Sequence, residues 1–295
     1  MSIYDEIKGS FKSGSALTKL IYINLAVFLA VKIVSVFFFL ASSSQTFSLV
    51  NWLAVPADLT NLLHRPWTIV TYMFLHEGFL HILFNMLWLY WFGQIFLSYF
   101  DDKKLLSVYL VGGLAGAALY ILAFNVFPAF EQITPVSFAL GASASVIAIV
   151  IATSVYAPNH KINLMFFGPV ALKYIALVTI LIDVLSIASS NAGGHIAHLG
   201  GALFGYLYIS QLKRGKNMTK GFDRFMDKIF SLFKPRPKIK VTYKRPMTDM
   251  ERDIEYNKAQ AAKQEDIDKI LDKIAKSGYS SLTKKEKEIL FKNGK

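Results

Sequence analysis

Long apolar runs separated by short polar stretches fill the first 212 positions of the chain. Six such segments can be marked, at roughly 18–41, 68–97, 105–127, 138–156, 164–187 and 194–212. Each can supply the ~20 residues that a helix needs to cross the hydrocarbon core of a bilayer. The pattern predicts an all-α polytopic membrane protein with six transmembrane helices within residues 17–212. The first run is long for a signal peptide, so we read it as an anchor that stays.

The remaining positions have a different pattern, with charged residues between apolar ones. Residues 221–233 place apolar side chains at helical spacing, which is typical of an amphipathic helix on a membrane surface. Ile267, Ile270, Leu271 and Ile274 repeat a helical spacing in the tail. We predict a short cytoplasmic N-terminus (1–16), the membrane core (17–212), an amphipathic juxtamembrane helix (213–233), a basic Pro-rich linker (234–249) and a small helical tail module (250–295).

The amino-acid composition supports a membrane location and excludes every function that depends on cysteine. Apolar residues make up 54% of the chain, charged residues only 18%, and mean hydropathy is +0.40. Ordinary soluble domains are nearer a quarter charged. The chain has no cysteine, which excludes disulfides, thiolate zinc sites, iron–sulfur clusters and a cysteine nucleophile.

The positive charge lies almost entirely in the tail. Residues 213–295 carry 23 Lys/Arg and 12 Asp/Glu, whereas residues 1–212 are nearly balanced. Basic residues also flank the predicted helices at Lys19, Lys103, Lys161 and Lys213, all on one side of an even-numbered topology. By the positive-inside rule both termini are cytoplasmic. We therefore expect the tail to bind anionic lipid or a cytoplasmic protein, and no nucleic acid.

Polar residues inside apolar segments are costly to bury and are functional candidates. His76-Glu77 and His81 resemble a His-Glu-x-x-His zinc motif, but the histidines are at i and i+5. On a regular helix that spacing turns the second ring by ~140°, which argues against a zinc pair. His81 and Asn85, at i and i+4, share a face. They would either direct N–H donors to one point, as an oxyanion hole needs, or hold helices together.

Two later segments hold a hydroxyl and two imidazoles. Ser143 lies between small residues in Gly141-Ala-Ser-Ala-Ser145, although a serine in a spanning helix often bonds only to its own backbone. His198 lies one turn before Gly201, and Gly201 with Gly205 forms a close-packing face. If this face meets the fourth segment, a base meets a nucleophile.

Two further polar residues have plainer interpretations. His195 is expected at a loop end or at the interface, since it precedes His198 near the outer end of its segment. Asp183 lies late in the fifth segment and is expected to reach the outer interface, with a proton-relay or orienting role as the alternative.

The order of these motifs resembles the rhomboid family of intramembrane serine proteases over about residues 60–212. The matching residues are His76, His81 and Asn85 in the second segment, Gly141 and Ser143 in the fourth, and His198, Gly201 and Gly205 in the sixth, with Trp67 nine residues before His76. Two positions depart from the family pattern. Ile147 stands where well-studied members stack an aromatic ring on the histidine, and Thr68 follows Trp67 where arginine is typical.

The resemblance implies a six-helix rhomboid-like bundle that cuts peptide bonds in or near transmembrane segments. Ser143 would be the nucleophile and His198 the base of a dyad without a required carboxylate. His81, Asn85 and the Ser143 amide would form the oxyanion hole, with His76, Gly141, Gly201 and Gly205 in support. It implies single-span membrane proteins as substrates and no cofactor or metal.

The cellular location and two alternative functions are also expectations from the sequence. We expect a multi-pass protein of a bacterial cell membrane. The alternatives are a proton-coupled transporter that uses the histidines and Asp183, and a catalytically inactive, substrate-binding relative.

Overall fold

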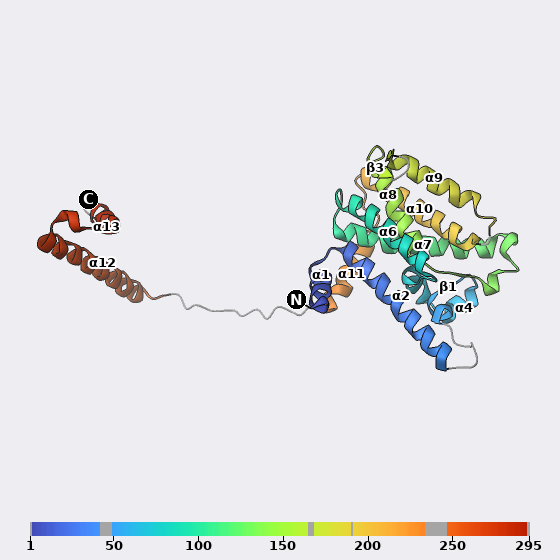
Figure 1. Cartoon of the computed structure of the whole chain (residues 1–295), viewed down its shortest axis with the longest axis horizontal. Coiled ribbons are helices and arrows are strands. Elements are labelled where there is room, and N and C mark those ends of the chain that lie inside the picture. The colour runs from blue at the N-terminus through green and yellow to red at the C-terminus, as the bar shows by residue number, and fades with distance from the viewer. Residues whose placement is uncertain (1, 42–48, 165–167, 190, 234–246, 294–295) are drawn as a thin grey trace. The chain divides into compact units, whose positions relative to one another are not determined.

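The computed structural model describes residues 2–41, 49–164, 168–189, 191–233 and 247–293 of the 295. The chain is mostly helical and forms two separate units, Met1–Lys234 and Pro235–Lys295 (Figure 1). The six long apolar segments lie in the first unit, and the second unit is the part of the basic tail after residue 234.

Helices lie over all six apolar segments of the first unit. They are α2 (Ala16–Ala41), α6 (Phe79–Leu97), α7 (Asp102–Val126), α8 (Ser143–Tyr156), α9 (Leu172–Leu185) and α10 (Ala192–Lys213). Of the helices that the structure describes, α2, α6 and α7 are long and apolar enough to cross a membrane, whereas α8 is apolar but only 14 residues long.

Three predicted segments begin too early, because each apolar run is interrupted at a glycine, Gly78, Gly141 or Gly168. Segment 68–97 contains α5 (Thr68–Thr71) and η1 (Tyr72–Phe74), and α6 begins only after Gly78. In segment 138–156, strand β2 (Phe138–Ala139) precedes the helix. In segment 164–187, Gly168 with φ +68 and Pro169 belong to a hairpin of β3 (Lys161–Leu164) and β4 (Gly168–Ala171).

Helix α8 is the centre of the bundle. It packs against α6, α7, α9 and α10, which lie around it in Figure 1. Eleven of its residues, Ala144 to Ser154, are buried. A helix that is apolar on all sides is stable when other helices surround it. Contacts on every side therefore fix the position of α8 in the bundle.

The long connection between α2 and α6 is folded onto the segment before α8. It contains α3 (Leu49–Leu53), β1 (Val55–Pro56) and α4 (Leu59–His64), and β1 pairs antiparallel with β2. The indole of Trp67 stacks on Trp52 and donates to its carbonyl oxygen at 2.9 Å, while the Arg65 guanidinium lies over the Trp52 ring. Two short 3-10 turns, η2 (Pro128–Phe130) and η3 (Thr134–Val136), lie between α7 and β2.

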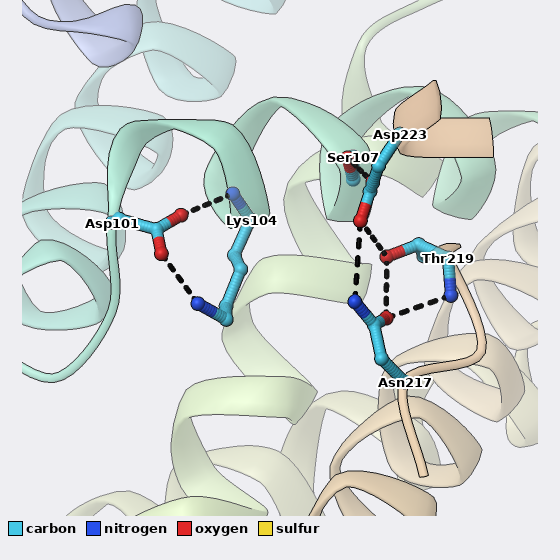
Figure 2. Close-up of polar contacts among 6 residues, drawn as sticks. All are labelled: Asp101, Lys104, Ser107, Asn217, Thr219 and Asp223. Carbon is cyan, nitrogen blue, oxygen red and sulfur yellow. Dashed lines mark hydrogen bonds and ion pairs between the residues drawn. The ribbon is translucent and has the colours of Figure 1, made fainter. Parts of the chain in front are cut away.

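Two amphipathic helices flank the bundle, α1 (Ile3–Ser13) and α11 (Lys220–Phe233). Figure 2 shows how α11 is attached: its buried Asp223 accepts hydrogen bonds from Ser107 of α7 at 2.6 Å, Asn217 at 3.2 Å and Thr219 at 3.3 Å. Lys103 adds an ion pair with Asp227 at 2.6 Å. Polar contacts thus tie α11 to the start of α7.

The second unit is a helical hairpin of α12 (Asp249–Ser277), η4 (Tyr279–Ser281) and α13 (Lys284–Asn293). Ile270 and Leu282 are its buried apolar residues. Glu286 of α13 accepts hydrogen bonds from Lys273 of α12 at 2.8 Å and from the Thr283 amide at 2.7 Å. These contacts lower the pKa of Glu286 to about 2.

Candidate functional site

Ser143 is the first residue of α8 and follows a turn that needs glycine. Gly141 has φ +127, and its amide donates to the carbonyl oxygen of Tyr72 at 2.9 Å. A Cβ at residue 141 would stand 2.9 Å from Nε2 of His81 and 3.5 Å from Oγ of Ser143. Glycine is therefore required by both φ and space, and its absent side chain lets the His81 ring come close to the serine.

The start of α8 also offers backbone donors. No side chain caps this helix, and the first amides of a helix have no partner inside it. The Ser143 amide is one of these groups, and the helix dipole makes this end attractive to negative charge.

Helix α10 brings His198 to Ser143 through backbone-to-backbone packing. A Cβ at Gly201 would overlap the carbonyl oxygen of Ala144, and one at Gly205 would overlap that of Ala148. These two glycines let α10 lie directly against α8. As a result, Oγ of Ser143 and Nε2 of His198 are 2.6 Å apart, within hydrogen-bond distance.

Asp183 of α9 holds the other side of the His198 ring. Its Oδ1 lies 2.8 Å from Nδ1 of His198 and 2.8 Å from Nδ1 of His195, and the residue is only 4% exposed. A carboxylate accepts hydrogen bonds, so each Nδ1 carries the proton. Nε2 of His198 is then the unprotonated nitrogen that accepts from the hydroxyl of Ser143.

The structure changes the interpretation of two residues. Asp183 is buried and faces the rings of His195 and His198, which favours the orienting role given above as its alternative. His195 lies in the first turn of α10 and pairs with Asp183 across the α9–α10 connection. That connection is short, from Ser186 to Asn191. Two antiparallel helices joined so closely must bring Asp183 beside the start of α10, which is the sequence signal that could have revealed the pair.

His81 and Asn85 occupy the side of the site formed by α6. Asn85 Nδ2 donates to the backbone carbonyl oxygen of His81 at 2.8 Å and lines the same cavity as Ser143. His81 directs Nε2 toward the turn at Gly141. Both side chains thus lie on the helix face that adjoins the serine.

His76 lies outside α6, which begins after Gly78. The spacing argument on a continuous helix was therefore wrong in its premise. The two rings meet edge to face with centroids 5.1 Å apart. His76 is buried, and neither of its ring nitrogens has a hydrogen-bond partner among the described residues.

A cavity of about 340 Å³ opens beside the serine, between α6, α8, α9 and α10. Its lining combines the polar groups above with apolar and aromatic side chains: Phe84, Asn85, Trp88, Ser143, Val146, Ile147, Thr179, Ile182, Asp183, His195 and His198. Ser145, two residues after Ser143, is fully buried outside this cavity, and its hydroxyl has no partner in the described part of the chain.

Within the described residues, one group of three side chains, a carboxylate and two imidazoles, combines groups that can bind a metal. Oδ1 of Asp183 and one ring nitrogen each of His195 and His198 lie within 4.8 Å of one another. The sequence interpretation had considered only His76 and His81 for a metal.

Comparison with protein families divides the chain as the structure does. A model of the Rhomboid domain matches residues 63–214, just over half of the chain, and covers every residue of the site. A second model, described as a family of unknown function (DUF6576), matches residues 251–295 in the tail.

Three curated relatives resemble the first unit. RHOMBOID-like protein 12, mitochondrial, from Arabidopsis thaliana is 30% identical over 52% of this chain and 48% of its own length. Rhomboid protease GlpG from Yersinia pseudotuberculosis is 29% identical over 54% and 52%. Presenilin-associated rhomboid-like protein A, mitochondrial, from Danio rerio is 28% identical over 56% and 41%. The matches thus cover about half of each relative's length or less.

Proposed function

Because this chain belongs to the rhomboid family of membrane proteins, we propose that it is an intramembrane serine endopeptidase. The observation that carries the proposal is the row of hydrogen bonds from Ser143 through His198 to Asp183, beside an open cavity. Nucleophile, base and orienting group stand in the order that acyl transfer needs.

The reaction proceeds in two halves. Oγ of Ser143 attacks the peptide carbonyl carbon while Nε2 of His198 takes its proton. His198 then gives this proton to the leaving amine, and an acyl-enzyme remains. A water molecule, deprotonated by the same nitrogen, hydrolyses the ester and restores the serine. Asp183 keeps the proton on Nδ1 throughout and stabilises the imidazolium that forms.

The oxyanion of each tetrahedral intermediate needs donors on the opposite side. We assign this role to His81, Asn85 and the Ser143 amide, since all three adjoin the serine and the helix dipole favours negative charge there. Loss of one such donor costs about 10²–10³ in rate.

The length of α8 supports a site below the membrane surface. Its 14 residues rise about 21 Å, less than the ~30 Å hydrocarbon core. A helix that ends at one face therefore starts inside the bilayer, and the Gly141 turn and cavity admit water. A helical substrate has its carbonyls hydrogen-bonded and must unwind before attack, which favours single-span substrates with glycine, proline or small residues near the cut.

Topology and location belong to the same proposal. We infer that all six helices cross the membrane with both termini in the cytoplasm, as the flanking lysines predict. The bacterial cell membrane stays a prediction, because the relatives above include mitochondrial proteins. Binding of the tail to anionic lipid or to a cytoplasmic protein also stays a prediction.

The decisive experiment compares two serines two residues apart. Ser143→Ala should lower cleavage of a single-span model substrate by about 10⁴-fold or more and abolish labelling by a fluorophosphonate. Ser145→Ala should retain both, because the Ser145 hydroxyl lies outside the cavity and bonds to nothing described.

Activity that survives Ser143→Ala would overturn the proposal. A transporter would instead show pH-driven flux in vesicles without labelling, and an inactive relative would show neither labelling nor cleavage.

A further inference from the structure

Asp183, His195 and His198, which we call the Asp183 cluster, contain one imidazole more than a serine hydrolase needs. Hydrolysis requires one imidazole on the carboxylate, yet Oδ1 of Asp183 accepts from two, at 2.8 Å each. Two imidazole nitrogens and one carboxylate oxygen form a donor set that binds Zn²⁺ in proteins. His195 and His198 stand at i and i+3 on α10, so they share a helix face.

The spacing of the three atoms suits a small ion after a modest adjustment. They lie within 4.8 Å of one another. Ligands at about 2.0–2.2 Å from a tetrahedral zinc ion are about 3.3 Å apart. Each imidazole nitrogen therefore has to move slightly away from the carboxylate oxygen, which is 2.8 Å away, and the two nitrogens have to lie about equally close to each other. The cavity that these residues line gives an ion a path of entry and room for a water as fourth ligand.

The charge of the cluster points the same way. Asp183 is 4% exposed, and its ion-pair partners in the described part of the chain are the two histidines. When both rings are neutral, the cluster holds one buried negative charge that hydrogen bonds alone compensate. A divalent cation would place an opposite charge directly on this carboxylate, which hydrogen bonds from neutral rings do not supply.

We propose that Asp183, His195 and His198 form an inhibitory site for Zn²⁺ or a similar divalent transition metal. The inhibitory effect, though not the binding itself, rests on the proposed protease function. An ion on Nδ1 of His198 takes the place of the proton there. The single N–H of the neutral ring then stands at Nε2, which can no longer accept a proton from Ser143. The metal therefore prevents His198 from acting as a base, although it does not contact Ser143.

The binding experiment uses the full chain in detergent or liposomes, with Zn²⁺ alone as the probe. Equilibrium dialysis should find one tightly bound Zn²⁺ per chain in the wild type and in Ser143→Ala. That stoichiometric site should be lost in His195→Gln, which keeps a donor to Asp183, and in His195→Ala. His160→Ala should bind like the wild type, because His160 contacts Tyr99 away from the cavity.

Activity gives the second readout. Zn²⁺ should inhibit substrate cleavage and fluorophosphonate labelling of the wild type, and a chelator should restore both. In each His195 variant the inhibitory concentration, measured against that variant's own metal-free rate, should rise at least tenfold. Equal zinc binding by the wild type and both His195 variants would overturn the proposal, as would absence of binding to Ser143→Ala.

The two proposals can fail separately. Stoichiometric zinc that depends on His195, in a protein without cleavage or labelling, would refute the protease and leave the metal site. A chelator that inactivates the enzyme would refute the inhibitory role.

Discussion

Two buried aspartates, at sites near opposite ends of α10, have nearly equal exposure and quite different surroundings. Asp183 is 4% exposed and is held by two imidazoles, one of which contacts Ser143. Asp223 is 9% exposed and is held by two hydroxyls and an amide (Figure 2).

The partners decide what each carboxylate can do. Hydroxyl and amide groups neither gain nor lose a proton near neutral pH, so the contacts of Asp223 serve to attach α11. An imidazole can gain and lose a proton in this range, so the contacts of Asp183 can support proton transfer. Burial of a carboxylate is therefore evidence of a specific role, but its nature has to be read from the neighbours.

The same substitution at both sites is the strongest test of this contrast. Asp183→Asn should lower the cleavage rate by about 10²–10⁴-fold, because an amide N–H facing Nδ1 favours the wrong tautomer of His198. Asp223→Asn should leave the rate within about tenfold. Kinetics of the two variants, with circular dichroism to confirm folding, measure the difference. Equal losses would mean that Asp183 serves only the fold.

A second prediction concerns the close packing that joins α8 and α10. Gly201→Ala should lower cleavage by about 10²-fold, because the added Cβ overlaps the Ala144 carbonyl and moves His198 away from Ser143. Fluorophosphonate labelling rates give the same measure without substrate binding. Gly221→Ala is the matched control: a Cβ there meets nothing within 4 Å, so activity should not change.

The Asp223 cluster should affect stability rather than rate. Ser107→Ala removes the 2.6 Å hydrogen bond to Asp223 and should lower the free energy of unfolding by about 1–3 kcal/mol. Thermal melting in detergent measures this loss. Ser137→Ala is the control, since Ser137 is only half-buried and its hydroxyl donates to the Ile133 carbonyl oxygen within the same short turn. A clear fall in kcat at a temperature where Ser107→Ala is fully folded would show that contacts at this end of the bundle affect the active site.

The smallest effect is expected from Glu286, a half-buried carboxylate in the tail. The folded pKa of Glu286 is lowered to about 2 from 4.5, chiefly by Lys273. The resulting stabilisation is present above pH 4.5 and is lost as the pH falls toward 2. Carboxyl NMR of the full chain should record this titration. Glu286→Gln should speed amide exchange in α13 at neutral pH, whereas Glu265→Gln, which removes a pair within α12, should not.

Local pattern was sufficient for much of this architecture. Apolar runs predicted a helix over each of six segments, because length and hydropathy are local properties. The motifs at His81, Ser143 and His198 directed attention to residues that the structure brings together, and Gly201 predicted the close approach of two helices. The starts of three helices were misplaced, because the mean hydropathy of a run does not show the turns at Gly78, Gly141 and Gly168 that interrupt it.

The sequence by itself determined that the chain is a helical membrane protein with a basic tail and a serine and a histidine able to form a dyad. Only the tertiary structure decided that Asp183 turns inward and joins His195 and His198. The physical reason is that hydropathy locates a residue along a helix but leaves its direction open. That direction is set by which helices are neighbours, and a buried carboxylate is stable only where those neighbours supply donors.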